Sequence, residues 1–130
     1  MIVIDASAFI ELLLGTASGD NIARRLSGPA NDRCAPHLLD VEVAQVLRRF
    51  ERRGALTAER CREALRDLSD FPLRRYPHPA LLPRIWELRK NLTAYDATYI
   101  ALAEALDAPL VTCDRRLTNA PGHTARIELC

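Results

Sequence analysis

Short apolar runs alternate with amphipathic stretches along the chain. Two runs, Ile2-Val3-Ile4 and Leu110-Val111-Thr112, are rich in β-branched residues and lack a 3.6-residue period, which is typical of buried strands. Between them, apolar side chains recur every three or four residues, as in amphipathic helices. Strands that alternate with helices favour a parallel sheet with helices on both faces.

Capping and stop residues set the limits of the predicted elements. Thr57 and Thr93 are candidate N-caps, whereas Gly15, Gly54 and Pro109 end helices. The predicted strands cover residues 2–4, 33–35, 73–76, 110–112 and 126–129. The predicted helices cover residues 7–14, 20–26, 38–53, 57–70 and 81–92, a stretch between Thr93 and Pro109, and a short segment after Asp114. We therefore expect one α/β domain, residues 1–130, folded as a three-layer sandwich with a parallel sheet of about five strands.

Composition agrees with a soluble globular protein. The chain has 130 residues, of which 48% are hydrophobic and 27% charged, with a net charge of +1, so it is not mainly disordered. No apolar run is long enough to span a membrane, and the acid at position 5 is unlike a signal peptide. We therefore expect a cytoplasmic protein with no membrane partner. The near-zero net charge also excludes nucleic-acid binding by bulk charge alone.

The cysteines and arginines allow two further expectations. Four cysteines, at positions 34, 61, 113 and 130, show no zinc-finger spacing, so we expect reduced thiols, with Cys130 exposed and oxidisable. Lys90 is the single lysine among 18 basic residues, and the other 17 are arginine. Codon bias is the favoured explanation and phosphate recognition is the alternative; composition alone does not choose between them.

Acidic residues follow both of the clear strands. Asp5 comes directly after the first strand, and Asp114 lies just past the strand that ends at Thr112. Ligands of open parallel sheets bind beyond the carboxyl ends of the strands, so the two carboxylates meet at one edge if these strands are neighbours. Each Asp is also a natural N-cap for the helix that follows it. Two acids at equivalent strand ends favour a site.

Two helices supply further acids. Asp96 lies in the first turn of its helix, on the shoulder of the buried face, where it is also part of a capping-box pattern that begins at Thr93. Asp40 and Glu42 both flank the apolar stripe of the helix over residues 38–53. They are about 200° apart around the helix, so they cannot aim at the same point. Helical spacing leaves the choice between them open.

Carboxylates that gather in one place need a cation. Without one they repel each other and bind protons more tightly. All-oxygen ligands suit Mg²⁺ or Mn²⁺, which can orient a phosphodiester and make a bound water more acidic. Ser7 and Thr112 are placed to hold such a carboxylate or water. The pattern predicts hydrolysis of a phosphate ester without a covalent protein intermediate.

The chain resembles the PIN-domain family, in particular its VapC-type toxin ribonucleases. The matching segments, which occur in the family's order and span essentially the whole chain, are Ile2-Val-Ile-Asp5-Ala-Ser7, Leu39-Asp-Val-Glu42-Val-Ala-Gln-Val-Leu, Tyr95-Asp96-Ala-Thr-Tyr-Ile-Ala-Leu-Ala and Leu110-Val-Thr112-Cys-Asp114-Arg-Arg-Leu. Residues from about Ala55 to Arg89 carry no family motif.

This resemblance implies a five-stranded parallel sheet and an endoribonuclease dependent on Mg²⁺ or Mn²⁺. It places the metal-binding and catalytic acids at Asp5, Glu42, Asp96 and Asp114, with Thr112 as the catalytic hydroxyl. The choice of Glu42 over Asp40 comes from the family. The resemblance also implies a structured RNA substrate such as transfer or ribosomal RNA, a VapB-like antitoxin and a homodimer.

The family interpretation gives some arginines a role. Arg115 and Arg116 directly follow Asp114 and would border the metal, so they are candidate substrate-binding residues together with Ser7, although surface solubility explains them equally. Other adjacent pairs occur at positions 24–25, 48–49 and 52–53.

Several other functions remain to be weighed. A receiver domain would need paired acids after the first strand and a late lysine, and a haloacid-type phosphatase would need Asp at position 7, where this chain has Ser. Both are disfavoured. A DNA nuclease with the same acidic site and a non-catalytic, antitoxin-binding protein are the remaining alternatives.

The remaining residues of note have structural interpretations. Trp86 is expected to pack in the core or in a dimer interface. His37, His78 and His123 lie in predicted loops, away from the acidic motifs. Cys113 alternates away from Asp114 along the strand, so it is not expected to be a ligand.

Overall fold

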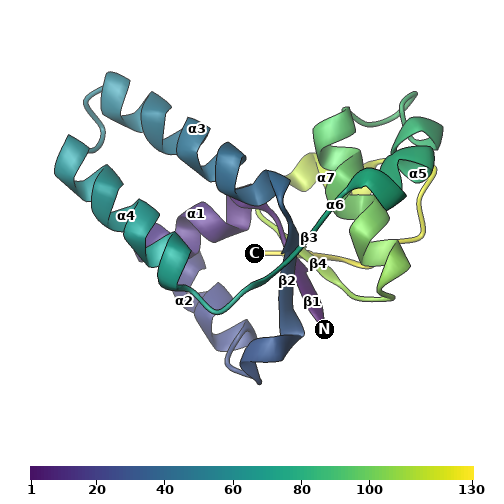
Figure 1. The fold of residues 1–130 in the computed structure, drawn as a ribbon, viewed down its shortest axis with the longest axis horizontal. Helices are drawn as coiled ribbons and strands as arrows, with labels where there is room; N and C mark the ends of the chain where they lie inside the picture. Colours follow the sequence, from purple (N-terminus) through teal and green to yellow (C-terminus); the bar gives the residue numbers. More distant parts are fainter.

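The computed structural model describes residues 1–130, apart from the side chain of Asn31. Its five strands form one sheet in the order β3-β2-β1-β4-β5, and every pairing is parallel (Figure 1). The strands are β1 (Ile2–Ile4), β2 (Arg33–Pro36), β3 (Arg74–Tyr76), β4 (Leu110–Thr112) and β5 (Ile127–Leu129). The expected parallel α/β sheet is confirmed, and β1 and β4 are neighbours.

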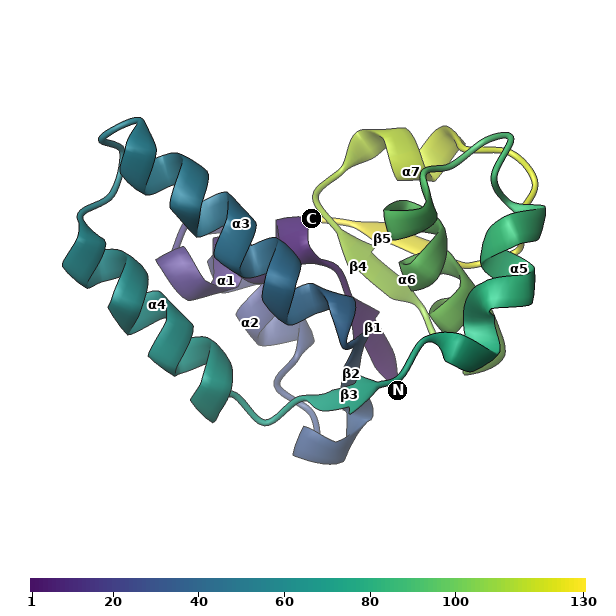
Figure 2. The same ribbon diagram turned by 45° about the horizontal axis from the view of Figure 1, so that its top comes forward.

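Helices cover the two faces of this sheet. They are α1 (Ala6–Leu14), α2 (Ala17–Arg25), α3 (Leu38–Arg52), α4 (Ala58–Asp70), α5 (Leu82–Glu87), α6 (Ala94–Ala105) and α7 (Arg115–Asn119), with 3-10 turns η1 (Ala30–Asp32) and η2 (Pro79–Leu81). Figure 2 shows α1–α4 on one side of the sheet and α5–α7 on the other. Among the described residues, no helix is long and apolar enough to cross a membrane.

The buried core is continuous through the sheet. Val3, Ile4 and Leu110 of the two central strands are fully buried, as is Phe9 of α1. Burial of these apolar side chains is the main favourable contribution to folding. Helix α6 is buried from Ala97 to Ala103 because it packs against β1, β2, β4 and α5. The residues around Asp5, Asp96 and Asp114 are therefore held by a rigid framework.

Helix α2 begins earlier than the pattern predicted. It starts at Ala17 rather than Asp20, because the Thr16 hydroxyl accepts the backbone N–H of Gly19 at 3.0 Å and caps the helix. A Cβ atom on Gly19 would lie 2.1 Å from the carbonyl oxygen of Glu11. A glycine at this position is therefore needed for the close approach of α1 and α2.

The predicted helix over residues 81–92 is shorter than expected, and of the two alternatives for Trp86, core or dimer interface, the core is wrong. The helix covers Leu82–Glu87 instead of reaching Leu92, because the chain tightens into turns in which the Arg89 N–H donates to the Trp86 carbonyl. Trp86 is 67% exposed and does not pack in the core. It lies against the Arg89 guanidinium, 4.5 Å from the ring centre, which is a cation–π geometry.

The expectation of four reduced cysteines is also wrong. Cys113 and Cys130 form a disulfide, whereas Cys34 and Cys61 are free and buried. The sheet register explains the pairing. Thr112 on β4 is opposite Leu129 on β5, so the residues that follow them, Cys113 and Cys130, are also opposite each other. The bond fastens the C-terminal end of the chain beside Asp114.

Candidate active site

Asp5 is the centre of the site. It follows β1, is 6% exposed, and caps α1 because its Oδ1 accepts the Ala8 N–H at 3.0 Å. The capping role and a place in the site therefore coexist. Burial raises the pKa of Asp5, an effect that hydrogen bonds from Thr112, Ala8 and Ser7 oppose.

Two hydroxyl groups join Asp5 to the end of β4. The Ser7 hydroxyl donates to Oδ1 of Asp5 at 2.7 Å, and the Thr112 hydroxyl donates to Oδ2 at 2.5 Å. Each hydroxyl also accepts a backbone N–H: Ser7 from Cys113 at 2.9 Å and Thr112 from Asp114 at 3.0 Å. Residues more than a hundred positions apart are thus locked into one polar network, as the strand positions predicted.

Asp114 lies on the other side of Thr112, at the start of α7. Its Oδ1 accepts the Arg116 N–H at 2.9 Å, so it is an N-cap as well. The Arg116 guanidinium binds both of its carboxylate oxygens, with a shortest distance of 2.5 Å, and these hydrogen bonds lower the pKa of Asp114. Arg116 is therefore the counter-ion of Asp114 in this structure, while Arg115 is exposed. Phosphate binding by either arginine stays a prediction.

The structure separates Asp40 from Glu42. Asp40 forms a bidentate ion pair with Arg75 of β3, with a shortest distance of 2.8 Å. Glu42 turns towards the acidic edge instead. Its Oε1 and the hydroxyl of Tyr99 are both buried without a geometrically sound hydrogen bond among the described side chains. Burial is the main cause of the raised pKa of Glu42, and the charges of Asp5 and Asp96 add to it.

Asp96 completes the set from the first turn of α6. Its N–H donates to the Thr93 hydroxyl at 3.1 Å, which caps the helix. The side chain is half-buried, and burial raises its pKa, whereas the nearby Arg116 charge lowers it. It lies beside a pocket of about 250 Å³ that Arg116 also lines.

The four acids form one electrostatic cluster. The charges of Asp5 and Asp96 raise the pKa of Glu42. The charge of Asp114 raises the pKa of Asp5 and of Asp96. The pKa of Asp114 itself is lowered, because Arg116 binds its carboxylate. Within the described part of the chain, however, no three acidic, histidine or cysteine side chains are close enough to form a complete metal-binding group. The carboxylates share an edge of the sheet without being arranged as finished ligands.

The donor chemistry of this edge fits a divalent cation. Oε1 of Glu42 is buried without a well-formed hydrogen bond, and the Tyr99 hydroxyl, close enough to lower the pKa of Glu42, is its one neighbouring donor. Such an oxygen is costly unless a positive charge reaches it. The nearby groups are carboxylate and hydroxyl oxygens, which Mg²⁺ and Mn²⁺ prefer. Asp5, Glu42, Asp96 and Asp114 are therefore the residues that would hold such an ion.

Sequence reasoning missed the part that Tyr99 plays. Its spacing with Ala103 and Leu106 places Tyr99 on the buried side of α6, and Tyr99 is 2% exposed. Its hydroxyl, however, is buried near Glu42, and the charge of Glu42 adds to the burial that raises the pKa of Tyr99. The available signal was its spacing of three residues from Asp96, which places both on one side of α6. Tyr95, which lies one turn earlier on α6, is 63% exposed.

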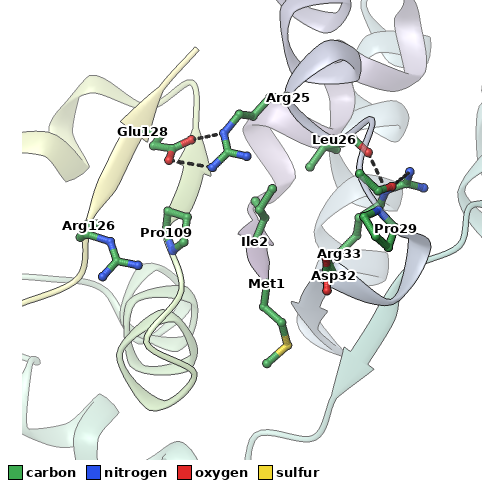
Figure 3. Close-up of a pocket in the computed structure, with 11 residues that line it drawn as sticks. Met1, Ile2, Arg25, Leu26, Pro29, Asp32, Arg33, Pro109, Arg126 and Glu128 are labelled. Atoms are coloured by element: carbon green, nitrogen blue, oxygen red, sulfur yellow. Dashed lines mark hydrogen bonds and ion pairs between the residues drawn. The ribbon is translucent and has the colours of Figure 1, made fainter.

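A larger pocket lies at the opposite edge of the sheet. It measures about 460 Å³ and is lined by residues at the amino ends of the strands, including Met1, Arg33 and Arg126 (Figure 3). Its arginines are already engaged: Arg25 binds Glu128, and Arg33 donates to the carbonyls of Leu26 and Gly28. The acidic site is therefore separate from this pocket.

The fold and site define an α/β protein with clustered carboxylates at the carboxyl edge of a parallel sheet. The family model described as "PIN domain" matches residues 2–122, and the chain belongs to the PIN-domain family. The recognised resemblance is thereby confirmed.

Relatives of the chain cover nearly its full length. It is 44% identical to "Ribonuclease VapC1" of Mycobacterium tuberculosis over 128 residues, which are 98% of this chain and 96% of the relative. It is 48% identical to "Ribonuclease VapC9" of the same organism over 119 residues, 92% of this chain and 90% of the relative.

Solved structures agree on the fold. PAE2754 from Pyrobaculum aerophilum superposes with a TM-score of 0.74 at 26% identity, covering 97% of this chain and 81% of that chain. VapBC2 from Rickettsia felis, solved bound to a DNA fragment from its promoter, has a TM-score of 0.72 at 16% identity, covering 99% of this chain and 98% of that chain.

Proposed function

We propose that this chain is an endoribonuclease of the VapC type, the toxin of a toxin–antitoxin pair, and that it depends on Mg²⁺ or Mn²⁺. The observation that carries the proposal is the polar network around buried Asp5, surrounded by Glu42, Asp96 and Asp114. Relatives named as VapC ribonucleases, at up to 48% identity, support the activity. We also propose that the chain forms a single domain.

The residues of the site divide the work. The four carboxylates would hold the cation, which when bound stabilises negative charge on a phosphodiester and acidifies a water molecule. Ser7 and Thr112 keep both oxygens of Asp5 in a fixed orientation, so that the carboxylate loses little freedom on binding. Arg116 neutralises Asp114 and would move to a substrate phosphate once another cation takes its place.

The partners follow from the same proposal. A structured RNA, such as transfer or ribosomal RNA, is the proposed substrate, and a VapB-like antitoxin is the proposed inhibitor. A homodimer also stays a prediction. Leu82 and Trp86 of α5, 54% and 67% exposed, are apolar surface that a second protein chain would cover.

The decisive experiment is cleavage of end-labelled RNA by the purified chain. Total RNA, purified transfer RNA and ribosomal RNA are incubated with Mg²⁺, with Mn²⁺ or with EDTA, and single-stranded and duplex DNA are tested in parallel. We expect cleavage of RNA with either metal, none in EDTA, and none by the Asp5→Asn variant. A single 2′-deoxy substitution at the mapped cleavage position should not block the reaction, because water rather than the 2′-hydroxyl attacks.

The other outcomes identify the alternatives. Cleavage of DNA in preference to RNA would indicate a DNA nuclease of the same fold. Tight binding of a VapB-like protein, with no hydrolysis of any nucleic acid, would indicate a non-catalytic member. Cleavage in EDTA that survives Asp5→Asn would contradict the proposed site altogether.

A further inference from the structure

Four arginines on the outer half of α3 have no carboxylate partner. Of the 13 arginines outside this group, six form ion pairs with acids among the described side chains, as Arg75 does with Asp40. The α3 group consists of four exposed arginines: Arg48, Arg49, Arg52 and Arg53. Among the described side chains, no acid lies within ion-pair distance of any of them. Arg53 instead stacks on Phe50, 5.2 Å from the ring centre.

This arrangement of like charges is unfavourable without a partner. Arginines four residues apart on a helix repel each other, and α3 together with its C-cap, Arg53, contains two such pairs, 48 with 52 and 49 with 53. Glu51 is the only acidic residue between positions 43 and 58. A polyanion is the ligand that would relieve this repulsion. The guanidinium group suits phosphate because its fork of donors can bind two oxygens at once.

Two of these arginines lie on the same face of α3 as Glu42. At 100° per residue, Arg49 is about 20° short of Glu42 after two turns, and Arg53 is about 20° beyond it after three. Their positions along the axis are roughly 10 and 16 Å from Glu42, at 1.5 Å per residue. Arg48 and Arg52 are rotated from Glu42 by about 120° and 80°, so they lie on a different face.

The direction of α3 shows how this face is connected to the acidic site. The helix begins next to the carboxyl end of β2, one turn before Glu42, and runs outward from the sheet, away from α6 and α7 (Figures 1 and 2). A line from Glu42 through Arg49 to Arg53 therefore leads from the acidic site to the outer end of the hairpin formed by α3 and α4.

We propose that Arg49 and Arg53 form a phosphate-binding track that holds the RNA strand as it leaves the acidic site along α3. This inference rests on the proposed ribonuclease function and extends it to a substrate surface outside the metal-binding acids. The track binds backbone phosphates, so it contributes affinity for long or structured RNA without reading bases.

The test compares two double variants that remove the same charge from the same helix. Arg49→Ala/Arg53→Ala removes the track, and Arg48→Ala/Arg52→Ala is the matched control on the other face. Alanine favours helix at least as well as arginine, and all four positions are exposed, so both variants should keep the parent's circular dichroism and melting temperature within a few degrees.

Binding is measured by fluorescence anisotropy with a fluorescein-labelled synthetic hairpin RNA, in EDTA so that nothing is cleaved. We expect Arg49→Ala/Arg53→Ala to raise Kd about tenfold at 100 mM salt and to reduce the slope of log K against log salt by roughly 1.5, since each lost phosphate contact is worth about 0.7 to 0.9. The control should change Kd about twofold and leave the slope nearly unchanged.

A small substrate separates the track from the chemistry. Hydrolysis of bis(p-nitrophenyl) phosphate with Mn²⁺ involves only the acids, so both double variants should keep the parent rate, whereas cleavage of long RNA by Arg49→Ala/Arg53→Ala should show a raised KM. If the parent cleaves no RNA, the proposed function fails, whatever the variants do.

Two results would overturn the track while the parent remains an active ribonuclease. One is equal loss of hairpin affinity and of salt slope in the two double variants, which would indicate a diffuse charge effect. The other is unchanged RNA binding by Arg49→Ala/Arg53→Ala with weakened binding of the antitoxin protein, which would assign these arginines to a protein contact.

Discussion

Replacing Thr112 with valine tests the polar network directly. The side chain is fully buried at the end of β4, and valine has nearly the same shape, so the change removes a hydroxyl without opening a cavity. Two hydrogen bonds are lost: the one that the hydroxyl donates to Asp5 at 2.5 Å and the one that it accepts from the Asp114 N–H at 3.0 Å.

The size of the effect follows from the kind of bond. A hydrogen bond to a charged group contributes about 1.5 to 3 kcal/mol, and a buried polar atom left without a partner costs about 1 to 3 kcal/mol. We expect a loss of about 3 kcal/mol in the free energy of unfolding. With an unfolding entropy of roughly 2.1 cal/mol/K per residue over this chain, that loss lowers Tm by about 10 °C.

The loss should depend on pH. The Thr112 hydrogen bond lowers the pKa of Asp5, which burial has raised, because it stabilises the charged carboxylate. Its contribution is therefore fully present where folded Asp5 is ionised, and it fades as pH falls through the folded pKa towards the ordinary value of 3.8. Thermal melts in EDTA at pH 7 and at pH 4 should show a smaller gap between parent and Thr112→Val at the lower pH.

Thr112→Ser is the matched control, because it keeps the hydroxyl and loses one buried methyl group, at about 1 kcal/mol. Metal-dependent RNA cleavage should fall about 10- to 100-fold in Thr112→Val, the usual cost of losing a group that orients a metal ligand, and stay near the parent rate in Thr112→Ser. If valine proves no more damaging than serine in both melting and cleavage, the hydroxyl does not orient Asp5 and the reasoning is refuted.

Other predictions concern single positions, each measured by thermal melting or RNA cleavage. Asp5→Asn should abolish cleavage and raise the Tm measured in EDTA at pH 7, because burial and, to a smaller extent, the charge of Asp114 disfavour the ionised carboxylate. The gain should vanish near pH 4, and a lower Tm at pH 7 would contradict this explanation. Glu42→Gln should reduce cleavage at least tenfold, whereas Asp40→Asn should leave cleavage intact. Asp40→Asn should lower the free energy of unfolding by at most about 1 kcal/mol, because the ion pair of Asp40 with Arg75 is partly exposed. Equal losses of activity in the two variants would refute the assignment of Glu42, rather than Asp40, to the site. Gly19→Ala should destabilise the fold by about 2 kcal/mol, since its Cβ would meet a backbone carbonyl of α1; a Tm at or above the parent value would show that the helices can separate at no cost. Dithiothreitol should lower Tm by about 10 °C by opening the disulfide of Cys130, which closes a loop of 17 residues, but should not affect Cys130→Ser.

Much of this fold could be predicted because its signals are local. β1 and β4 are β-branched runs with no helical period, and the caps at Thr57 and Thr93 each make the expected bond to a backbone N–H. The start of α2 could not be predicted in the same way. Glycine has a low helix propensity, so Gly19 on its own disfavours a helix. The reason for a glycine inside α2 is its close contact with α1, which the sequence pattern does not show.

The disulfide was missed for a related reason. Cysteine spacing along the chain does not report which strands are neighbours, and the pairing of Cys113 with Cys130 depends on the register of β4 with β5. The pattern of apolar residues predicts a last strand over residues 126–129 but does not say which strand it pairs with or in what register. Once the register is known, the two cysteines are adjacent by construction.

The choice between Asp40 and Glu42 shows where periodicity stops being informative. Both flank the buried stripe of α3, and they differ in what the rest of the fold places opposite them. For Asp40 that is Arg75, delivered by β3, and for Glu42 it is the acidic edge and the hydroxyl of Tyr99. A carboxylate that already has its own guanidinium gains little from a metal ion, whereas a half-buried carboxylate among other acids remains destabilised until a cation arrives. The position of the arginine therefore separates the structural acid from the candidate ligand, and it does so without reference to any relative.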